Sequence, residues 1–169
     1  MKKQNQNDEL VFLPLGGSNE VGMNLNAYGF GPAHDRKWII VDVGVTFGDQ
    51  STPGVDVIVP DPTFLEGENI LGIVLTHAHE DHIGAIPWLL KLRPDIPIVA
   101  SRFTIALISA KCKEHGQKPK FVEVNEKSDV TYGCFRVRFW AVNHSVPDAL
   151  GIMLGTPAGN IIHTGDIKL

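Results

Sequence analysis

Several features that would place a protein in a special class are scarce or missing in this sequence. It has two cysteines, Cys112 and Cys134, and because they do not form a CxxC pair we expect both to be reduced structural residues. No apolar run approaches the roughly 20 residues of a membrane span. The polar start, Met1 to Asp8, lacks the apolar core of a signal peptide. These absences predict a soluble, cytoplasmic protein with no membrane association.

An excess of positive charge is also missing. The formal net charge is −4 and the sequence pI is near 5.9, whereas a free-standing nucleic-acid-binding module is more often basic. If the chain binds a nucleic acid, that binding must therefore come from a local patch, from metal ions or from further chain. Hydrophobic residues make up 43% of the 169 residues and charged residues 20%, which predicts one globular domain with its own core.

The order of apolar segments predicts an α/β protein with mixed sheets and helices packed outside them. Residues 1–9 are expected to form a disordered tail, and residues 48–68 are rich in proline and glycine and are expected to be mostly loop. Residues 70–76 are almost continuously apolar, as in a strand buried on both faces. The other expected strands are residues 10–15, 25–30, 38–43, 96–100, 121–124, 135–142, 151–154 and 160–163, and the expected helices are residues 83–92 and 104–115.

The segment after the buried strand 70–76 is the most informative in the chain. It contains His77, His79, Asp81 and His82, which are four ligand-type side chains within six residues. Alternate residues of an extended chain point the same way, so His77 and His79 can reach one point together. A helix that begins there turns Asp81 and His82 toward a second point. Imidazole and carboxylate are natural zinc ligands, so this segment predicts two adjacent metal sites.

Two further ligand-type residues follow apolar strands. His144 comes after residues 135–142, and Asp166 comes after residues 160–163. Open α/β sheets place their sites at strand ends, so both residues are expected to join the histidine cluster as metal ligands. Of the other histidines, His163 is read as a satisfied core residue in preference to a supporting role at the site.

The segment Thr76-His77-Ala78-His79-Glu80-Asp81-His82 resembles the H-x-H-x-D-H signature of the metallo-β-lactamase superfamily. Its continuation to Pro87 is similar to the ribonuclease J group of the β-CASP nucleases. The same is true of Asn143 to Asp148, of His163 to Asp166, and of the opening segment from Leu15 to Asn24. The resemblance covers almost the whole chain from about Val11 onward, and it implies that residues 10–169 are the amino-terminal part of an αββα sandwich.

The resemblance also implies a role for each residue of the cluster. His77, His79 and His144 would bind one zinc ion, Asp81 and His82 would bind a second, and Asp166 would bridge the two. Asp42 would orient a ligand histidine from behind. The residues expected to carry catalysis are Asp81, His82 and Asp42, with Asp81 orienting the attacking water or taking its proton. Zinc is the expected metal, and manganese is an alternative at such nitrogen and oxygen sites.

The activity that the resemblance implies is hydrolysis of RNA phosphodiester bonds by a metal-bridging hydroxide, as a 5′ exonuclease and endonuclease. In this interpretation the second half of the sandwich and the β-CASP domain are absent. The first zinc site is then complete and the second is open on one side, which leaves open whether the chain is active alone. A homo-oligomer is expected for the complete enzyme.

Two alternatives remain open. The first is another hydrolase of the same fold, a thioesterase or a lactonase. The second is a non-catalytic module that binds metal or a partner chain. The basic residues between 111 and 120 could touch RNA, although a solvated helix face is the preferred interpretation. They are Lys111, Lys113, Lys118 and Lys120.

Overall fold

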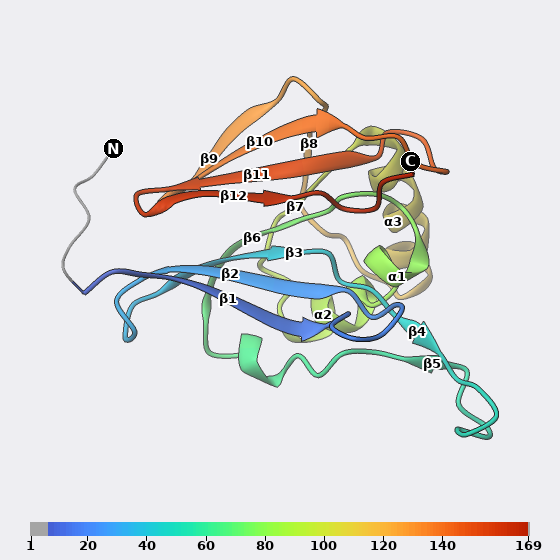
Figure 1. The fold of residues 1–169 in the computed structure, drawn as a ribbon. Coiled ribbons are helices and arrows are strands. Elements are labelled where there is room, and N and C mark those ends of the chain that lie inside the picture. Colours follow the sequence, from blue (N-terminus) through green and yellow to red (C-terminus); the bar gives the residue numbers. More distant parts are fainter. Residues whose placement is uncertain (1–6, 169) are drawn as a thin grey trace.

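The computed structural model describes residues 7–168, which form two β-sheets packed face to face, with helices on the outer side of one of them (Figure 1). The first sheet has the strand order β1-β2-β3-β6-β7-β8. Its first three strands pair antiparallel, whereas β3, β6, β7 and β8 run parallel. The six strands are β1 (Glu9–Gly16), β2 (Leu25–Gly31), β3 (Lys37–Val41), β6 (Asn69–Val74), β7 (Ile98–Ala100) and β8 (Phe121–Glu123).

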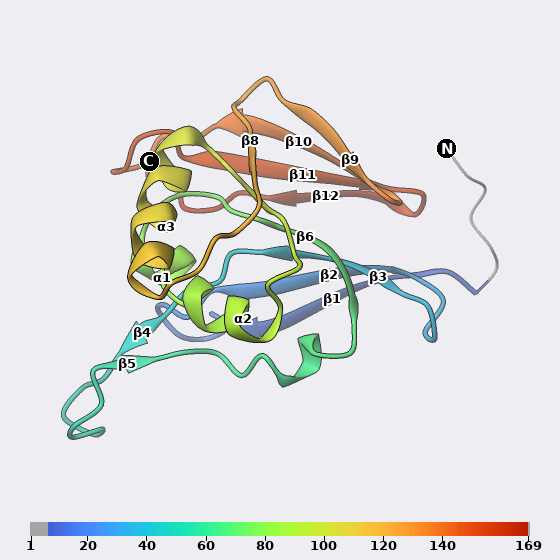
Figure 2. The same cartoon turned by 180° about the vertical axis from the view of Figure 1, so that it is seen from behind.

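The second sheet is an antiparallel meander with the order β12-β11-β10-β9. A short hairpin of β4 and β5 extends from the body of the molecule, and the helices gather on the side seen in Figure 2. The bounds of these elements are β4 (Thr46–Phe47), β5 (Val57–Ile58), η1 (Thr63–Leu65), α1 (Glu80–Ile83), α2 (Ile86–Leu92), α3 (Arg102–Glu114), β9 (Asp129–Tyr132), β10 (Phe135–Ala141), β11 (Leu150–Thr156) and β12 (Gly159–His163).

The central strands of the first sheet are buried on both faces. Along β3, Trp38 and Ile40 belong to the core that the helices complete, whereas Ile39 and Val41 belong to the core shared with the second sheet. Because a strand alternates its side chains, both faces of β3 must be apolar. Within residues 7–168 the helical residues of the core pack on the first sheet. The predicted mixed-sheet sandwich with outer helices is confirmed, and the described part shows three of the layers of an αββα arrangement.

The structure corrects several expected boundaries. The helix expected at residues 83–92 is divided into α1 and α2, because the Ala85 amide donates to the Val43 carbonyl at 2.9 Å and so leaves the helical pattern. Pro87 lies in the first turn of α2, where a missing amide costs nothing. Strand β9 was not predicted, because its four residues form a half-buried strand only by pairing with β10.

The chain start is described only in part. The expected tail of residues 1–9 falls mostly outside the described residues, and β1 already begins at Glu9. Among the helices that the structure describes, none has the length and apolar composition needed to cross a bilayer.

Candidate metal centre

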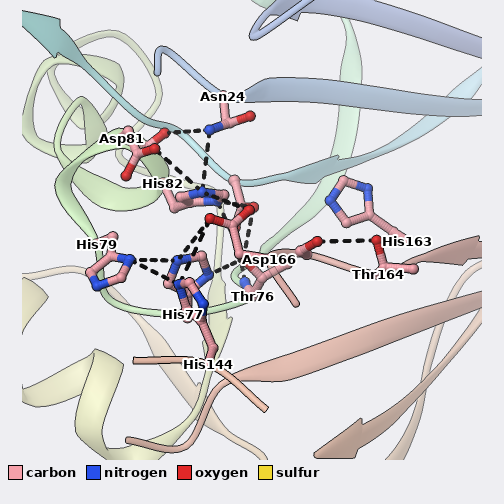
Figure 3. Close-up of polar contacts among 12 residues, drawn as sticks. Asn24, Thr76, His77, His79, Asp81, His82, His144, His163, Thr164 and Asp166 are labelled. Carbon is pink, nitrogen blue, oxygen red and sulfur yellow. Dashed lines mark hydrogen bonds and ion pairs between the residues drawn. The ribbon is translucent and has the colours of Figure 1, made fainter. Parts of the chain in front are cut away.

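The ligand-type side chains come from loops that follow four strands. Asp42 follows β3, His77 lies three residues after β6, His144 follows β10, and Asp166 follows β12. In a sheet, strands that run the same way bring their carboxyl ends to the same edge. Figure 3 shows the side chains of His77, His144 and Asp166 pointing toward one another from these separate segments. The fold thus gathers residues from Asp42 to Asp166, which are 124 positions apart in the sequence, at one end of the sandwich.

Three histidines form the first group. Nδ1 of His79 lies 3.0 Å from Nε2 of His77 and 3.1 Å from Nε2 of His144 (Figure 3). These spacings are close to the ~3.3 Å edge of a tetrahedron built from Zn–N bonds of ordinary length. With Asp166, one ligand atom from each of the four residues lies within 4.8 Å of the others. The donor set and its spacing therefore fit a divalent transition metal.

A second group lies beside the first. Nε2 of His82 is 3.6 Å from Oδ2 of Asp81 and 3.5 Å from Oδ1 of Asp166. The other oxygen of Asp166, Oδ2, is 3.7 Å from Nε2 of His144. One carboxylate thus presents one oxygen to each group, which is the arrangement that a bridging ligand needs. The division into two groups that share Asp166 agrees with the predicted assignment, and the metal-binding roles themselves stay predictions.

The turn that carries these residues is held by the loop after β3. His79 has extended backbone, and α1 begins immediately after it. The amide of Val43 donates to the carbonyl of His82 at 2.7 Å. A side chain at Gly44 would collide with the carbonyl of Asp81, so only glycine permits this close approach. The backbone therefore changes direction between the ligands of the first group, His77 and His79, and those of the second group, Asp81 and His82.

A buried carboxylate lies behind both groups. Asp42 is fully buried, and its backbone adopts a left-handed conformation with φ of 62°. Its Oδ2 lies 2.7 Å from Nδ1 of His82, and its Oδ1 accepts the backbone amide of Thr76 at 2.8 Å. The structure thus places Asp42 against a histidine of the cluster, as the resemblance implies.

The two buried histidines of the motif differ in acidity. Burial lowers the pKa of His77 to about 4, and the nearby charge of His82 acts in the same direction. Burial also acts to lower the pKa of His82, but the charge and hydrogen bond of Asp42 outweigh it and raise that pKa to about 9. Burial acts to raise the pKa of Asp42, and the charge of His82 and its hydrogen bond hold it below its usual value. His77 is therefore a neutral imidazole at pH 7, which is the form that binds metal.

The model of the family described as "Beta-lactamase superfamily domain" matches residues 37–169. This chain belongs to the beta-lactamase superfamily. The matched segment contains all six predicted ligands and Asp42.

Several relatives similar in sequence share one name. A protein named Ribonuclease J from Corynebacterium glutamicum is 57% identical over 157 residues, which are 92% of this chain and 21% of that protein. A Ribonuclease J from Mycobacterium tuberculosis is 52% identical over 156 residues, or 91% of this chain and 27% of that protein. The chain therefore spans between about a fifth and a third of the length of such relatives.

Solved structures support the fold. The metallo-beta-lactamase fold protein YhfI from Bacillus subtilis covers 95% of this chain and 63% of its own, with a TM-score of 0.62 and 19% identity. A protein of unknown function from Enterococcus faecalis matches with a TM-score of 0.70 and 20% identity, over 95% of this chain and 44% of its own. At these identities the likeness shows the metallo-β-lactamase fold alone.

Two residues at the superfamily site were not predicted to act there. The Thr76 hydroxyl lies between Asp42 and His77 and contacts both. Nδ2 of Asn24 donates to the carbonyl of Asp81 at 3.0 Å and lies 3.3 Å from Nε2 of His82 (Figure 3). The sequence offered one signal for them, since Thr76 lies inside the segment that resembles the superfamily signature and Asn24 inside the opening segment that resembles ribonuclease J. Their contacts depend on loops that meet only in the folded chain.

The other three histidines lie outside the ligand groups. Nδ1 of His163 is 2.8 Å from the Tyr28 hydroxyl, so this histidine links β12 to β2 and is satisfied there, as expected. His34 is exposed in a turn. His115 ends α3, and its ring lies 5.6 Å from that of Trp88.

Proposed function

We propose that this chain carries the metal centre of a metal-dependent RNA phosphodiester hydrolase similar to ribonuclease J. The observation that carries the proposal is the convergence of His77, His79, His144 and Asp166 within 4.8 Å, with Asp81 and His82 beside them. The sequence likeness to proteins named Ribonuclease J supports RNA as the substrate. Zinc is the proposed metal because three imidazoles dominate the first group, and manganese is the alternative. Cytoplasmic location and homo-oligomer formation stay predictions.

Two metal ions held here would supply an activated water and polarise a phosphoryl oxygen. The residues of the chain have separate tasks in this scheme. Asp81 is one-third exposed beside His82, so it is placed to orient the attacking water or to accept its proton. Asp166 faces both groups and would hold them at a constant separation. Asp42 is buried and does not face the substrate side, so its proposed task is to orient His82.

The first test is the metal content of the purified 169-residue chain after loading with zinc or with manganese. We expect at least one zinc ion per chain, lost when His77 and His79 are both changed to alanine. His34→Ala is the matched control, because it removes an exposed histidine outside the cluster and should leave the stoichiometry unchanged. Absence of bound metal, or equal loss in the control, would contradict the proposed centre.

The second test concerns the reaction class. The metal-loaded chain is offered an RNA oligonucleotide, a small aryl phosphodiester, a lactone and a thioester. Hydrolysis of the phosphodiesters that disappears in His144→Ala supports the proposal. Faster hydrolysis of the lactone or the thioester would favour another hydrolase of the same fold. Metal binding without hydrolysis of any of the four would favour a non-catalytic metal-binding module.

A further inference from the structure

Thr76 lies where the chain segments that deliver the ligands meet. It is 1% exposed, and its backbone carbonyl accepts the amide of Leu150 in β11 at 2.9 Å. The backbone of Gly165, next to Asp166, packs so closely on Thr76 that an added Cβ would be 3.1 Å from the Thr76 Cβ. The backbone amide of Thr76 donates to the carboxylate of Asp42. A buried residue with these three contacts is in position to set the geometry of the whole centre.

The hydroxyl of Thr76 joins two groups that do not touch each other directly. Its oxygen lies 2.8 Å from Oδ2 of Asp42 and 2.9 Å from Nδ1 of His77. An ionised carboxylate only accepts hydrogen bonds, so the hydroxyl must donate its proton to Asp42. Its lone pair is then free to accept a hydrogen bond from Nδ1–H of His77. The proton of the His77 ring is thereby held on Nδ1, and Nε2 is left bare on the side of His79 and His144.

Asp42 orients His82 in the same way but directly, without a hydroxyl between them. Its Oδ2 accepts from Nδ1 of His82, so Nε2 of that ring faces Asp81 and Asp166. One buried carboxylate therefore orients one histidine of each ligand group, directly for His82 and through the Thr76 hydroxyl for His77. Hydrogen bonds of this kind to a ligand histidine commonly change metal affinity by about 10- to 100-fold.

We propose that Thr76 is a positioning residue that fixes the Nε2-binding tautomer of His77 and, through Asp42, couples the two ligand groups. The inference deepens the proposed metal centre and rests on it. A free imidazole exchanges its proton between the two ring nitrogens, so the His77 ring cannot fix its own tautomer. The proposal gives this task to the Thr76 hydroxyl.

The tautomer is measured by nitrogen NMR of the histidine-labelled, metal-free chain. We expect the wild type and Thr76→Ser to hold the His77 proton on Nδ1, and Thr76→Val to show a mixture of tautomers. Thr76→Val keeps the branched shape and removes the hydroxyl, whereas Thr76→Ser keeps the hydroxyl. A wild-type His77 protonated on Nε2 would overturn the proposal without reference to any variant, so the test stands even if Thr76→Val fails to fold.

Zinc affinity is measured in parallel by competition with a chelator. We expect Thr76→Val to bind the first zinc about 10- to 100-fold more weakly and Thr76→Ser to bind close to wild type. Thr104→Val is the control, because Thr104 lies in α3, is also fully buried, and its hydroxyl bonds to Ser101 at the start of that helix, away from the centre. Unchanged affinity in Thr76→Val, or an equal loss in Thr104→Val, would overturn the proposal. A wild type that binds no zinc would refute the proposed centre, while the tautomer measurement would still decide the role of Thr76.

Discussion

His77 and His82 are neighbours in space with opposite acid–base behaviour. Both are almost completely buried, with 1% and 3% exposure, and their ring centroids are 4.0 Å apart. Burial lowers the pKa of His77 to about 4, whereas the contact of His82 with Asp42 overcomes burial and raises its pKa to about 9. The difference between these two pKa values shows that the partner of a buried histidine, and not burial alone, decides whether the ring carries charge.

The same difference separates the two candidate metal sites. The first group consists of imidazoles whose nitrogens converge, and because the pKa of His77 is about 4 its ring is already neutral at pH 7 when a metal enters. The second group sets one histidine among carboxylates, so a metal there must displace a proton from His82 at neutral pH. We therefore expect the first group to fill at lower pH and lower metal concentration than the second.

The largest effect is expected from Asp42→Asn in the metal-free chain. Asparagine tolerates the left-handed backbone of this position, so the change removes the charge with little backbone strain. Loss of one partner of a buried ion pair costs about 3–5 kcal/mol. We expect a fall of that order in the unfolding free energy at pH 6.5, measured with urea, and a large decrease in the pKa of His82, measured by NMR.

The control for this change is Asp129→Asn. Asp129 pairs with Arg136 on the surface, where water screens the charges, so its loss should barely move the urea midpoint. If Asp42→Asn leaves the pKa of His82 near 9, the carboxylate is not the cause of the contrast between the two rings.

The next largest effect is the pH dependence of stability of the metal-free chain. The folded pKa of His82 is about 9, above its ordinary value of 6.5, so its contribution is full below pH 6.5 and is lost as pH rises through 9. The folded pKa of His77 is about 4, so the unfolded chain binds the extra proton and stability falls as pH drops from 6.5 to 4. The fall in unfolding free energy on each side of pH 6.5 should be on the order of 3 kcal/mol.

Urea unfolding at pH 4.5, 6.5 and 8.5 measures this profile, and a maximum near pH 6.5 is expected. The variant His82→Gln should lose the decline above pH 6.5 and keep the decline below it. An alkaline decline of the same size in this variant would show that groups other than His82 produce it.

A smaller effect is expected from Asn24→Ala, which should affect His82 and leave His77 unchanged. The Asn24 amide donates to the Asp81 carbonyl and lies beside His82, but it does not contact His77. Loss of one partly buried hydrogen bond should cost about 1 kcal/mol in urea unfolding. The NMR signals of His82 should shift and those of His77 should stay. Asn160→Ala, an exposed change in β12, serves as the comparison, and equal effects of the two would argue against a specific role for Asn24.

The smallest effect concerns the basic residues of α3 and the segment after it. Lys111 pairs with Glu80 at 2.8 Å with both side chains partly exposed, so Lys111→Gln should cost no more than about 1 kcal/mol. Changing all four lysines, Lys111, Lys113, Lys118 and Lys120, to glutamine should leave RNA affinity and its salt dependence close to wild type in fluorescence anisotropy. A large loss of affinity would show that this face binds phosphates.

Much of the fold could be predicted because its signals are local. The apolar run of residues 70–76 predicts a strand buried on both faces, and Gly116 after α3 adopts the left-handed conformation expected at a helix end. The break between α1 and α2 could not be predicted in this way. It depends on the hydrogen bond from Ala85 to Val43, which lies 42 residues earlier and meets it only in the folded chain.

The sequence by itself determined which residues can bind metal, because ligand chemistry belongs to the side chain and the spacing of His77, His79, Asp81 and His82 is local. Tertiary structure alone decided what holds the two groups apart and which protonation states His77 and His82 take. The loop from Asp42 to Gly44 separates the two groups, and the contact with Asp42 gives His82 a charge that His77 lacks. Electrostatic and hydrogen-bonding effects of this kind act across space and fall off within a few ångströms, so they appear only where the fold brings distant segments together.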